Sequence, residues 1–263
     1  MSIRNNLSKS LTNVNMGIYL SVLGIIAGEV LLFLGYVYPG MAVHIINIQA
    51  ITIAIILGNY SPGTKNVLQS LLLPLQMRII NLAMPLFFTI TLLWYTLVYG
   101  VMYISIYYVT TNQNITSKEI GINFKHWYIY FPAALLIGIA MAMLEFQILH
   151  PTPLISDMKL QNLFFISMVM FVFVGAVEEL IFRSILLTRL EKMFGMFKSL
   201  LLSSLLFGIM HSGYGLISEV VFATFFGFVL GFIFQKTRSF PFILLIHGTA
   251  NVLLYGILPI LTL

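Results

Sequence analysis

Long apolar runs broken by short polar stretches make up most of this 263-residue sequence. A helix needs about 20 apolar residues to cross the hydrocarbon core of a bilayer, and some eight runs approach that length. We therefore expect an all-α, polytopic transmembrane helix bundle of about eight helices. The predicted helices cover residues 17–38, 41–59, 80–109, 127–149, 161–188, 197–211, 216–235 and 240–262.

Polar segments separate these runs. Residues 1–16 are polar, and residues 110–125 form the one long polar connection. A turn at residues 61–63 precedes the stretch Val67–Met77, which we expect to lie at the membrane interface. The first apolar run is too long for a signal peptide and lacks a small-residue cleavage pattern, so we expect it to remain as a membrane anchor.

The composition agrees with a membrane protein. Hydrophobic residues make up 60% of the chain and charged residues 8%, with a mean hydropathy of +1.01, far outside the range of soluble domains. The net charge is +5, but the basic residues are scattered through short connections, which indicates topology signals and headgroup contacts rather than a nucleic-acid partner. The chain has no cysteine, which excludes disulfides, thiolate zinc sites and cysteine nucleophiles. We expect a multi-pass protein of the cell membrane.

The basic residues give conflicting indications of orientation. In the second half of the chain, Lys159 stands alone on one side of the predicted helices, and the other side carries Arg189, Lys192, Lys198, Lys236 and Arg238. The positive-inside rule makes that richer side cytoplasmic. In the first half of the chain, Arg4, Lys9, Lys65 and Arg78 indicate by the same rule that the N-terminal side is cytoplasmic. Three predicted spans separate Arg78 from Arg189, so either one early segment does not cross, or residues 67–109, interrupted by Pro74, Arg78 and Pro85, cross twice.

Three polar clusters interrupt the last four predicted helices. They are Glu178-Glu179 with Arg183, then His211 after Phe207, then His247 with Asn251. Ionisable groups inside a membrane cost several kcal/mol unless they are paired or hydrated, so such residues are functional candidates. Glu178, His211 and His247 each lie 11 to 13 residues from the basic connections, which at 1.5 Å per residue puts all of them roughly 16 to 20 Å deep. This shared depth predicts one polar pocket among the last four helices.

The residue types in this pocket suit amide hydrolysis. Glu178 and His211 can hold and deprotonate a water, and His247 and Asn251 can donate hydrogen bonds to an oxyanion. The spacing of Glu179 and Arg183 allows an ion pair on one helical face. The rival use is a zinc site formed by Glu178, His211 and His247, but the chain lacks the His-Glu-x-x-His helix that usually accompanies such sites.

These motifs resemble those of a known family. Glu-Glu-x-x-x-Arg at 178–183, Phe-x-x-x-His at 207–211 and His-x-x-x-Asn at 247–251 are similar to the three motifs of the CAAX-protease and bacteriocin-processing family, which includes type II CAAX prenyl endopeptidases and bacterial Abi-domain proteins. The resemblance covers residues 161–263, the expected catalytic core, whereas residues 1–160 are expected to form transmembrane helices without a recognised motif.

The resemblance implies an intramembrane endopeptidase that cuts a membrane-associated peptide or protein. By that resemblance Glu178 and His211 activate the water, His247 and Asn251 form the oxyanion site, and the Glu179–Arg183 pair holds the pocket in shape. It implies a glutamate-type mechanism without a cofactor, with zinc as the less favoured alternative.

Two other classes of function use similar residues. A proton-coupled transporter also buries Glu and His within its helices, but the chain shows no inverted repeats. A non-catalytic membrane scaffold, such as a bacteriocin-immunity or regulatory protein, would use the same groups only for packing. Both stay open on the sequence alone.

Other ionisable residues of the predicted helices receive simpler interpretations. Glu29 and Glu145 have no evident partner in the sequence. Glu219 lies near a helix start, where the helix dipole favours an acid, and needs no further role. The histidines near segment ends are expected to be interfacial: His44, His126 and His150.

Overall fold

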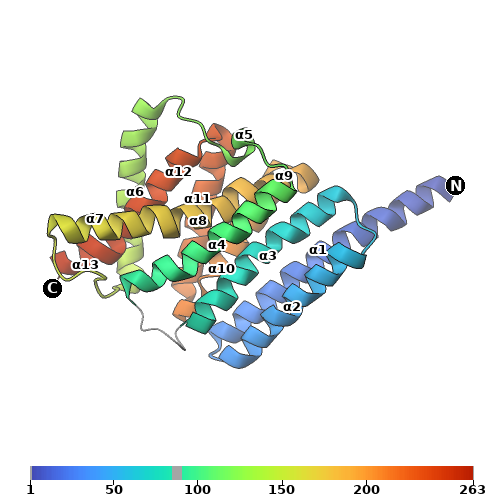
Figure 1. Ribbon diagram of the computed structural model, residues 1–263, viewed down its shortest axis with the longest axis horizontal. Helices are drawn as coiled ribbons and strands as arrows, with labels where there is room; N and C mark the ends of the chain where they lie inside the picture. The colour runs from blue at the N-terminus through green and yellow to red at the C-terminus, as the bar shows by residue number, and fades with distance from the viewer. Residues whose placement is uncertain (1, 85–90, 263) are drawn as a thin grey trace.

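The computed structural model describes residues 2–84 and 91–262, with side chains from residue 16 onward. Every regular element in these ranges is a helix, as the sequence predicts. The long helices pack into one bundle, and α7, α8 and α9 follow one another as a continuous rod across it (Figure 1). The helices are α1 Ser2–Phe33, α2 Val37–Leu57, α3 Pro62–Ala83, α4 Leu92–Asn112, α5 Ser117–Ile120, α6 Trp127–Leu149, α7 Leu160–Met168, α8 Ala176–Glu179, α9 Thr188–Phe194, α10 Met196–Ile209, α11 Ile217–Thr237, α12 Phe240–Val252 and α13 Leu258–Leu261.

Eight helices within the described ranges are long and apolar enough to cross a membrane, and they correspond to the eight predicted ones. The helix predicted at 127–149 has the same bounds in the structure. The one predicted at 80–109 is wrong at its start, because α3 ends at Ala83 and α4 begins at Leu92. Residues 85–90, with the predicted break at Pro85, lie outside the described residues. The chain is therefore a multi-pass membrane protein.

Helix α3 is a further long helix, in the region predicted to lie at the interface. Its 22 residues extend roughly 33 Å at 1.5 Å per residue, which is enough to cross a bilayer core. Leu68, Leu71 and Leu75 are fully buried, and the helix packs against α1, α2 and α4. The interfacial prediction is wrong, because other helices cover α3. Since protein surrounds it instead of lipid, α3 can carry Arg78 inside its span.

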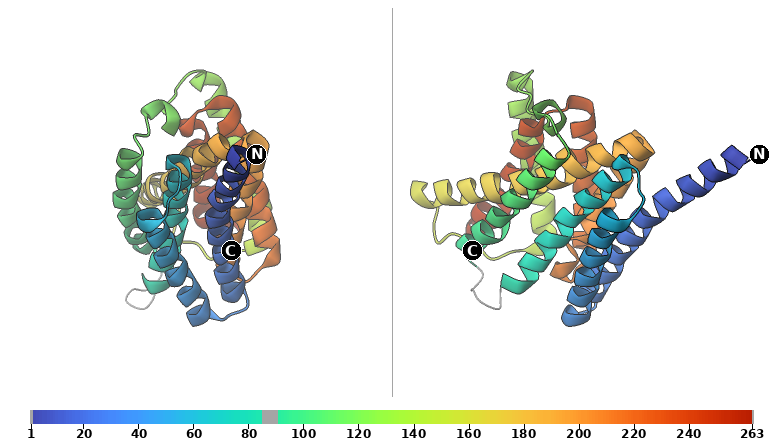
Figure 2. Two further views of the ribbon diagram at one scale, coloured as in Figure 1. Left: turned by 90° about the vertical axis from the view of Figure 1, so that its right-hand side faces the viewer. Right: turned by 45° about the vertical axis from the view of Figure 1, so that its right-hand side comes forward.

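This additional crossing removes the conflict in orientation. One end of the bundle is here called the basic end (Figures 1 and 2). It contains the start of α3, the connection from α4 to α6, helix α9 and the turn from α11 to α12, and the start of α1 projects beyond the bundle. Lys159 lies in the connection from α6 to α7 at the opposite end. The arrangement of α3 and α4 agrees with the alternative in which residues 67–109 cross twice, and by the positive-inside rule we expect the basic end on the cytoplasmic side. The basic end carries Lys65, Lys118, Lys125, Arg189, Lys192, Lys198, Lys236 and Arg238.

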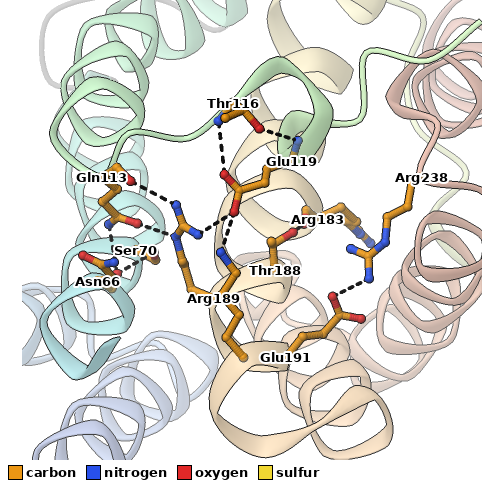
Figure 3. A network of polar contacts seen from close by, with 11 residues as sticks. Asn66, Ser70, Gln113, Thr116, Glu119, Arg183, Thr188, Arg189, Glu191 and Arg238 are labelled. Atoms are coloured by element: carbon orange, nitrogen blue, oxygen red, sulfur yellow. Dashed lines mark hydrogen bonds and ion pairs between the residues drawn. The ribbon is translucent and has the colours of Figure 1, made fainter. Parts of the chain in front are cut away.

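Polar side chains join the helix ends at the basic end (Figure 3). Glu119 accepts hydrogen bonds of 3.1 Å from Arg189 and 2.5 Å from Lys192, and it forms a capping box with Thr116 at the start of α5. Arg189 also donates to Gln113 at 2.7 Å. Partial burial raises the pKa of the Glu119 carboxyl, but the Lys192 hydrogen bond, the Thr116 N–H and the charge of Arg189 outweigh burial and lower it to about 2.

The rod that carries the acidic pair is not a regular α-helix. Helix α8 lies between two π-helical segments, Val169–Gly175 and Leu180–Leu187. A π-helical turn contains more residues than an α-helical one, so it rotates the residues that follow around the helix axis. Side-chain directions along this rod therefore could not be predicted from the α-helical period alone.

Small residues let α11 approach its neighbours closely. A Cβ on Gly227 would lie 3.0 Å from the Phe207 ring and 3.4 Å from the Arg183 guanidinium. On the facing helix, a Cβ on Gly208 would lie only 1.8 Å from the Thr224 hydroxyl. Glycine at these positions brings α10 and α11 together and so positions Phe207, the motif residue that α10 carries.

Candidate active site

A cavity of about 500 Å³ lies inside the bundle. Its wall is built by residues from helices α3, α4, α6, α8, α10, α11 and α12, so both the region with motifs and the N-terminal helices contribute. It extends to Val37, Gly213 and Tyr214, which lie at helix ends opposite the basic end. The cavity is therefore reached from the face that carries few basic residues.

Four of the predicted site residues line this cavity together: Glu178, His211, His247 and Asn251. Glu178 is 6% exposed, His247 4% and Asn251 6%, so what remains exposed of each faces the cavity instead of lipid. The sequence argument from equal depth predicted this convergence. The structure brings a carboxylate, two imidazoles and a carboxamide to one enclosed space.

The other two predicted residues, Glu179 and Arg183, lie behind the cavity wall. Arg183 donates a 2.8 Å hydrogen bond to Glu179, and its guanidinium lies 4.2 Å from the Phe207 ring centroid. The predicted i, i+4 ion pair is thus present. The same Glu179 oxygen also accepts a 2.7 Å hydrogen bond from Nδ1 of His247, which joins the pair to the cavity.

Glu178 has a different environment from its neighbour. One of its oxygens accepts a 2.7 Å hydrogen bond from the hydroxyl of Tyr99 in α4. The other oxygen lies 3.6 Å from Nε2 of His247. The two carboxylates of the Glu-Glu motif therefore lie on opposite sides of one imidazole ring.

His211 follows the C-terminal end of α10. Its Nδ1 donates a 2.9 Å hydrogen bond to the Phe207 carbonyl, which fixes the ring orientation and leaves Nε2 as the free ring nitrogen. The Phe207 ring packs beside both histidines, with centroid distances of 4.9 Å to His211 and 6.1 Å to His247. Phe207, the first residue of the second motif, thus positions both imidazoles.

Glu29 and Arg78 form a buried ion pair between α1 and α3. Arg78 donates two hydrogen bonds of 2.7 Å to the two Glu29 oxygens. His44 is fully buried, with Nε2 3.2 Å from Glu29. The interfacial position expected for His44 is wrong, and Glu29 has the partner that its sequence neighbours did not reveal. His126 and His150 do lie exposed at the two ends of α6.

This ion pair holds the backbone on both sides of His211. Arg78 donates a hydrogen bond to the Met210 carbonyl, and the Ser212 hydroxyl donates one of 2.5 Å to Glu29. The residues before and after the imidazole are therefore anchored to helices α1 and α3. The segment that carries His211 leaves α10 as a short turn, and these contacts replace the helical hydrogen bonds that it lacks.

Sequence reasoning missed Tyr99, Glu29 and Arg78 as supports of the site. The signal for the charged pair was available, because an acid and a base within apolar segments are expected to find each other. We placed Arg78 in a connection between helices, so its pairing with Glu29 inside the bundle was not predicted. No comparable signal exists for Tyr99, since tyrosine is common in membrane helices.

The grouping of possible donors bears on the zinc alternative. Among the described residues, no three His, Asp or Glu side chains are grouped so that they could hold one metal ion. Nδ1 of His211 donates to a carbonyl and Nδ1 of His247 to a carboxylate, and these hydrogen bonds orient the two rings. We therefore derive no chemical step through a metal.

Comparison with known proteins places this site in a family. Residues 160–253 match the family model described as type II CAAX prenyl endopeptidase Rce1-like. The match includes all six predicted site residues, and residues 1–159 lie outside it. No curated protein and no solved structure matches the chain. The resemblance noted from the three motifs is confirmed for the region that carries them.

Proposed function

Residues 160–253 belong to the type II CAAX prenyl endopeptidase family of membrane proteases, and we propose that this chain hydrolyses a peptide bond of a membrane-associated peptide or protein at Glu178 and His211. The observation that carries this proposal is the convergence of Glu178, His211, His247 and Asn251 on one cavity enclosed by transmembrane helices. We place the protein in the cell membrane, with residues 161–263 carrying the chemistry and residues 1–160 supporting it.

In the proposed reaction a water enters the cavity between Glu178 and His211. With Nδ1 of His211 donating to a backbone carbonyl, Nε2 offers a lone pair that accepts one hydrogen bond from the water. The Glu178 carboxylate takes the proton as the water oxygen attacks the peptide carbonyl carbon. The Tyr99 hydroxyl holds this carboxylate in place through its other oxygen.

The carbonyl oxygen becomes an oxyanion as the new bond forms. The Asn251 side chain and Nε2 of His247 donate hydrogen bonds to it, which lowers the barrier because the charge develops in a water-poor site. Nδ1 of His247 already donates to Glu179, so donation from Nε2 requires the doubly protonated ring. The carboxylates of Glu178 and Glu179 lie on either side of this ring.

Collapse of the tetrahedral intermediate completes the reaction. The C–N bond breaks, and the proton held by Glu178 passes to the departing amine, which leaves a new carboxyl and a new amino terminus. Glu179 and Arg183 take no part in bond making, and their role is to orient His247. No covalent enzyme intermediate is required.

Comparative peptidomics tests the proposal. Membranes from cells with the wild-type protein are compared with membranes that contain Glu178→Gln, and Glu119→Gln at the basic end serves as a matched control for the same change. We expect at least one peptide product to disappear in Glu178→Gln and to persist in Glu119→Gln and in the presence of metal chelators. Identical peptide profiles in all three strains would instead favour a transporter or a scaffold.

A further inference from the structure

A second carboxylate lines the same cavity without a partner. Glu145 of α6 is 7% exposed, and among the described residues it makes no hydrogen bond or ion pair. Behind it in α11, Glu219 is fully buried, and neither of its oxygens has a hydrogen-bond partner in the described part of the chain. Glu145 and Glu178 line the same cavity, and the helices that carry Glu145 and Glu219, α6 and α11, pack against each other. The helix dipole, which the sequence offered as a sufficient reason for Glu219, therefore does not explain why this residue is fully buried without a partner.

Among the described residues that line the cavity, no Lys or Arg is left unpaired to balance these carboxylates. Arg78 is the one Lys or Arg among the lining residues, and Glu29 already neutralises it through two hydrogen bonds. Arg183 lies outside the cavity and is paired with Glu179. An unpaired carboxylate within a membrane costs several kcal/mol. A cation that enters the cavity would remove this cost.

Aromatic side chains line the same cavity as the unpaired carboxylate. Trp94, Tyr95, Tyr214 and Tyr255 line the cavity, and the hydroxyls of Tyr214 and Tyr255 lie 2.6 Å apart. Glu145 lines the same cavity as these rings. Aromatic faces attract ammonium and guanidinium groups, and the attraction grows when water is excluded. A carboxylate among aromatic rings is a site suited to a cation.

We propose that Glu145, supported by Glu219 and the surrounding aromatic side chains, forms a subsite that binds a basic side chain of the substrate. This inference rests on the proposed function, since it takes the ligand to be a peptide whose scissile bond reaches Glu178 in the same cavity. The substrate class becomes a membrane-associated peptide with Lys or Arg close to the cleavage site. The basic group reaches Glu145 from the cavity end near Tyr214, opposite the basic end of the protein.

A pair of matched peptides tests the subsite by binding instead of cleavage. The first is a fluorescent hexapeptide of Leu and Ala with one central Lys, and the second carries acetyl-lysine at that position, which removes the positive charge and adds one acetyl group. Their binding to the purified full-length protein in lipid nanodiscs is measured by fluorescence anisotropy. We expect the Lys peptide to bind at least tenfold more tightly than the acetyl-lysine peptide.

Variants then locate the site. Glu145→Gln is expected to abolish the difference between the peptides, and Glu219→Gln to reduce it, whereas the control Glu119→Gln keeps it. Equal binding of both peptides to the wild-type protein would overturn the proposal, as would a difference that persists in Glu145→Gln. Binding of these peptides decides the subsite, and the peptidomic comparison with Glu178→Gln decides the peptidase, so the two failures are distinguishable.

Discussion

Arg78 in the third helix and Glu29 in the first form a two-pronged ion pair, with both hydrogen bonds at 2.7 Å and both side chains almost fully buried. Neither residue lies in the region that matches a family model. The pair nevertheless anchors the residues on both sides of His211. The N-terminal helices therefore do more than hold the protein in the membrane.

Removing Arg78 should destabilise the protein and disturb His211. Arg78→Met leaves the Glu29 carboxylate buried and unpaired, which costs about 3–5 kcal/mol. The double variant Arg78→Met with Glu29→Gln removes the charge on both sides and should recover much of the lost thermal stability in detergent. It should still cleave more slowly than the wild type, because the segment at 210–212 is no longer anchored. Full activity in the double variant would contradict this positioning role.

Tyr99→Phe tests the hydrogen bond to Glu178. The change removes one hydroxyl and keeps the packing of the ring, and a hydrogen bond to a charged group is worth about 1.5–3 kcal/mol. We expect kcat to fall by roughly ten- to a hundredfold, with little change in thermal stability. Tyr103→Phe in the same helix is the matched control, since its hydroxyl contacts a backbone carbonyl outside the proposed site. If both variants cleave at the same rate, Tyr99 does not support Glu178.

The absence of cysteine makes the orientation directly measurable. Met158→Cys lies at the end that the cavity reaches, and Met196→Cys lies at the basic end, with native exposures of 43% and 49%. In intact cells, a membrane-impermeant maleimide should label the first variant and leave the second unlabelled until the membrane is permeabilised. The reverse pattern would place the basic end outside the cell and contradict the positive-inside assignment.

The ionised Glu119 carboxylate should make the thermal stability of the protein fall at acid pH. Its carboxyl pKa is lowered from 4.5 to about 2, so the folded state favours the ionised form. The resulting stabilisation is present above pH 4.5 and is lost as the pH falls towards 2. The Tm of the wild type should therefore exceed that of Glu119→Gln at pH 6, and the difference should shrink as the pH is lowered through this range. Glutamine retains the capping box, so the comparison isolates the charge.

A difference in Tm that is constant from pH 6 to pH 2.5 would show that Glu119 stabilises the basic end without its charge. Raising the salt concentration should also reduce the difference at pH 6, because exposed ion pairs are screened.

Much of the fold follows from the sequence because lipid imposes a simple rule on length and polarity. The helix from Trp127 to Leu149 could be predicted to the residue, since both its ends coincide with a change in polarity. Helix α3 could not, because its neighbours cover it and it need not be as apolar as a lipid-facing span. The error about α3 also produced the conflict in orientation, which its crossing resolves.

The sequence predicted the depth of the site residues in the membrane, but it did not predict which side chains they contact. The fixed rise of a helix brought Glu178, His211 and His247 to one level, and the structure places all of them around one cavity. The contacts of Tyr99, Glu29 and Glu145 depend on which helices are neighbours and on how each is rotated. The π-helical segments on either side of α8 change that rotation, so a regular period could not supply it.

The most direct test of the account is the cleavage rate of a peptide found by the peptidomic comparison, measured with purified protein in lipid vesicles. General base catalysis contributes roughly 10²–10⁴-fold, so Glu178→Gln should lower the rate by at least that range while Glu119→Gln cleaves like the wild type. His211→Asn should fail similarly, with the exposed His126→Asn as its control. Cleavage by folded Glu178→Gln at the wild-type rate would contradict the assignment of Glu178 as the group that activates water.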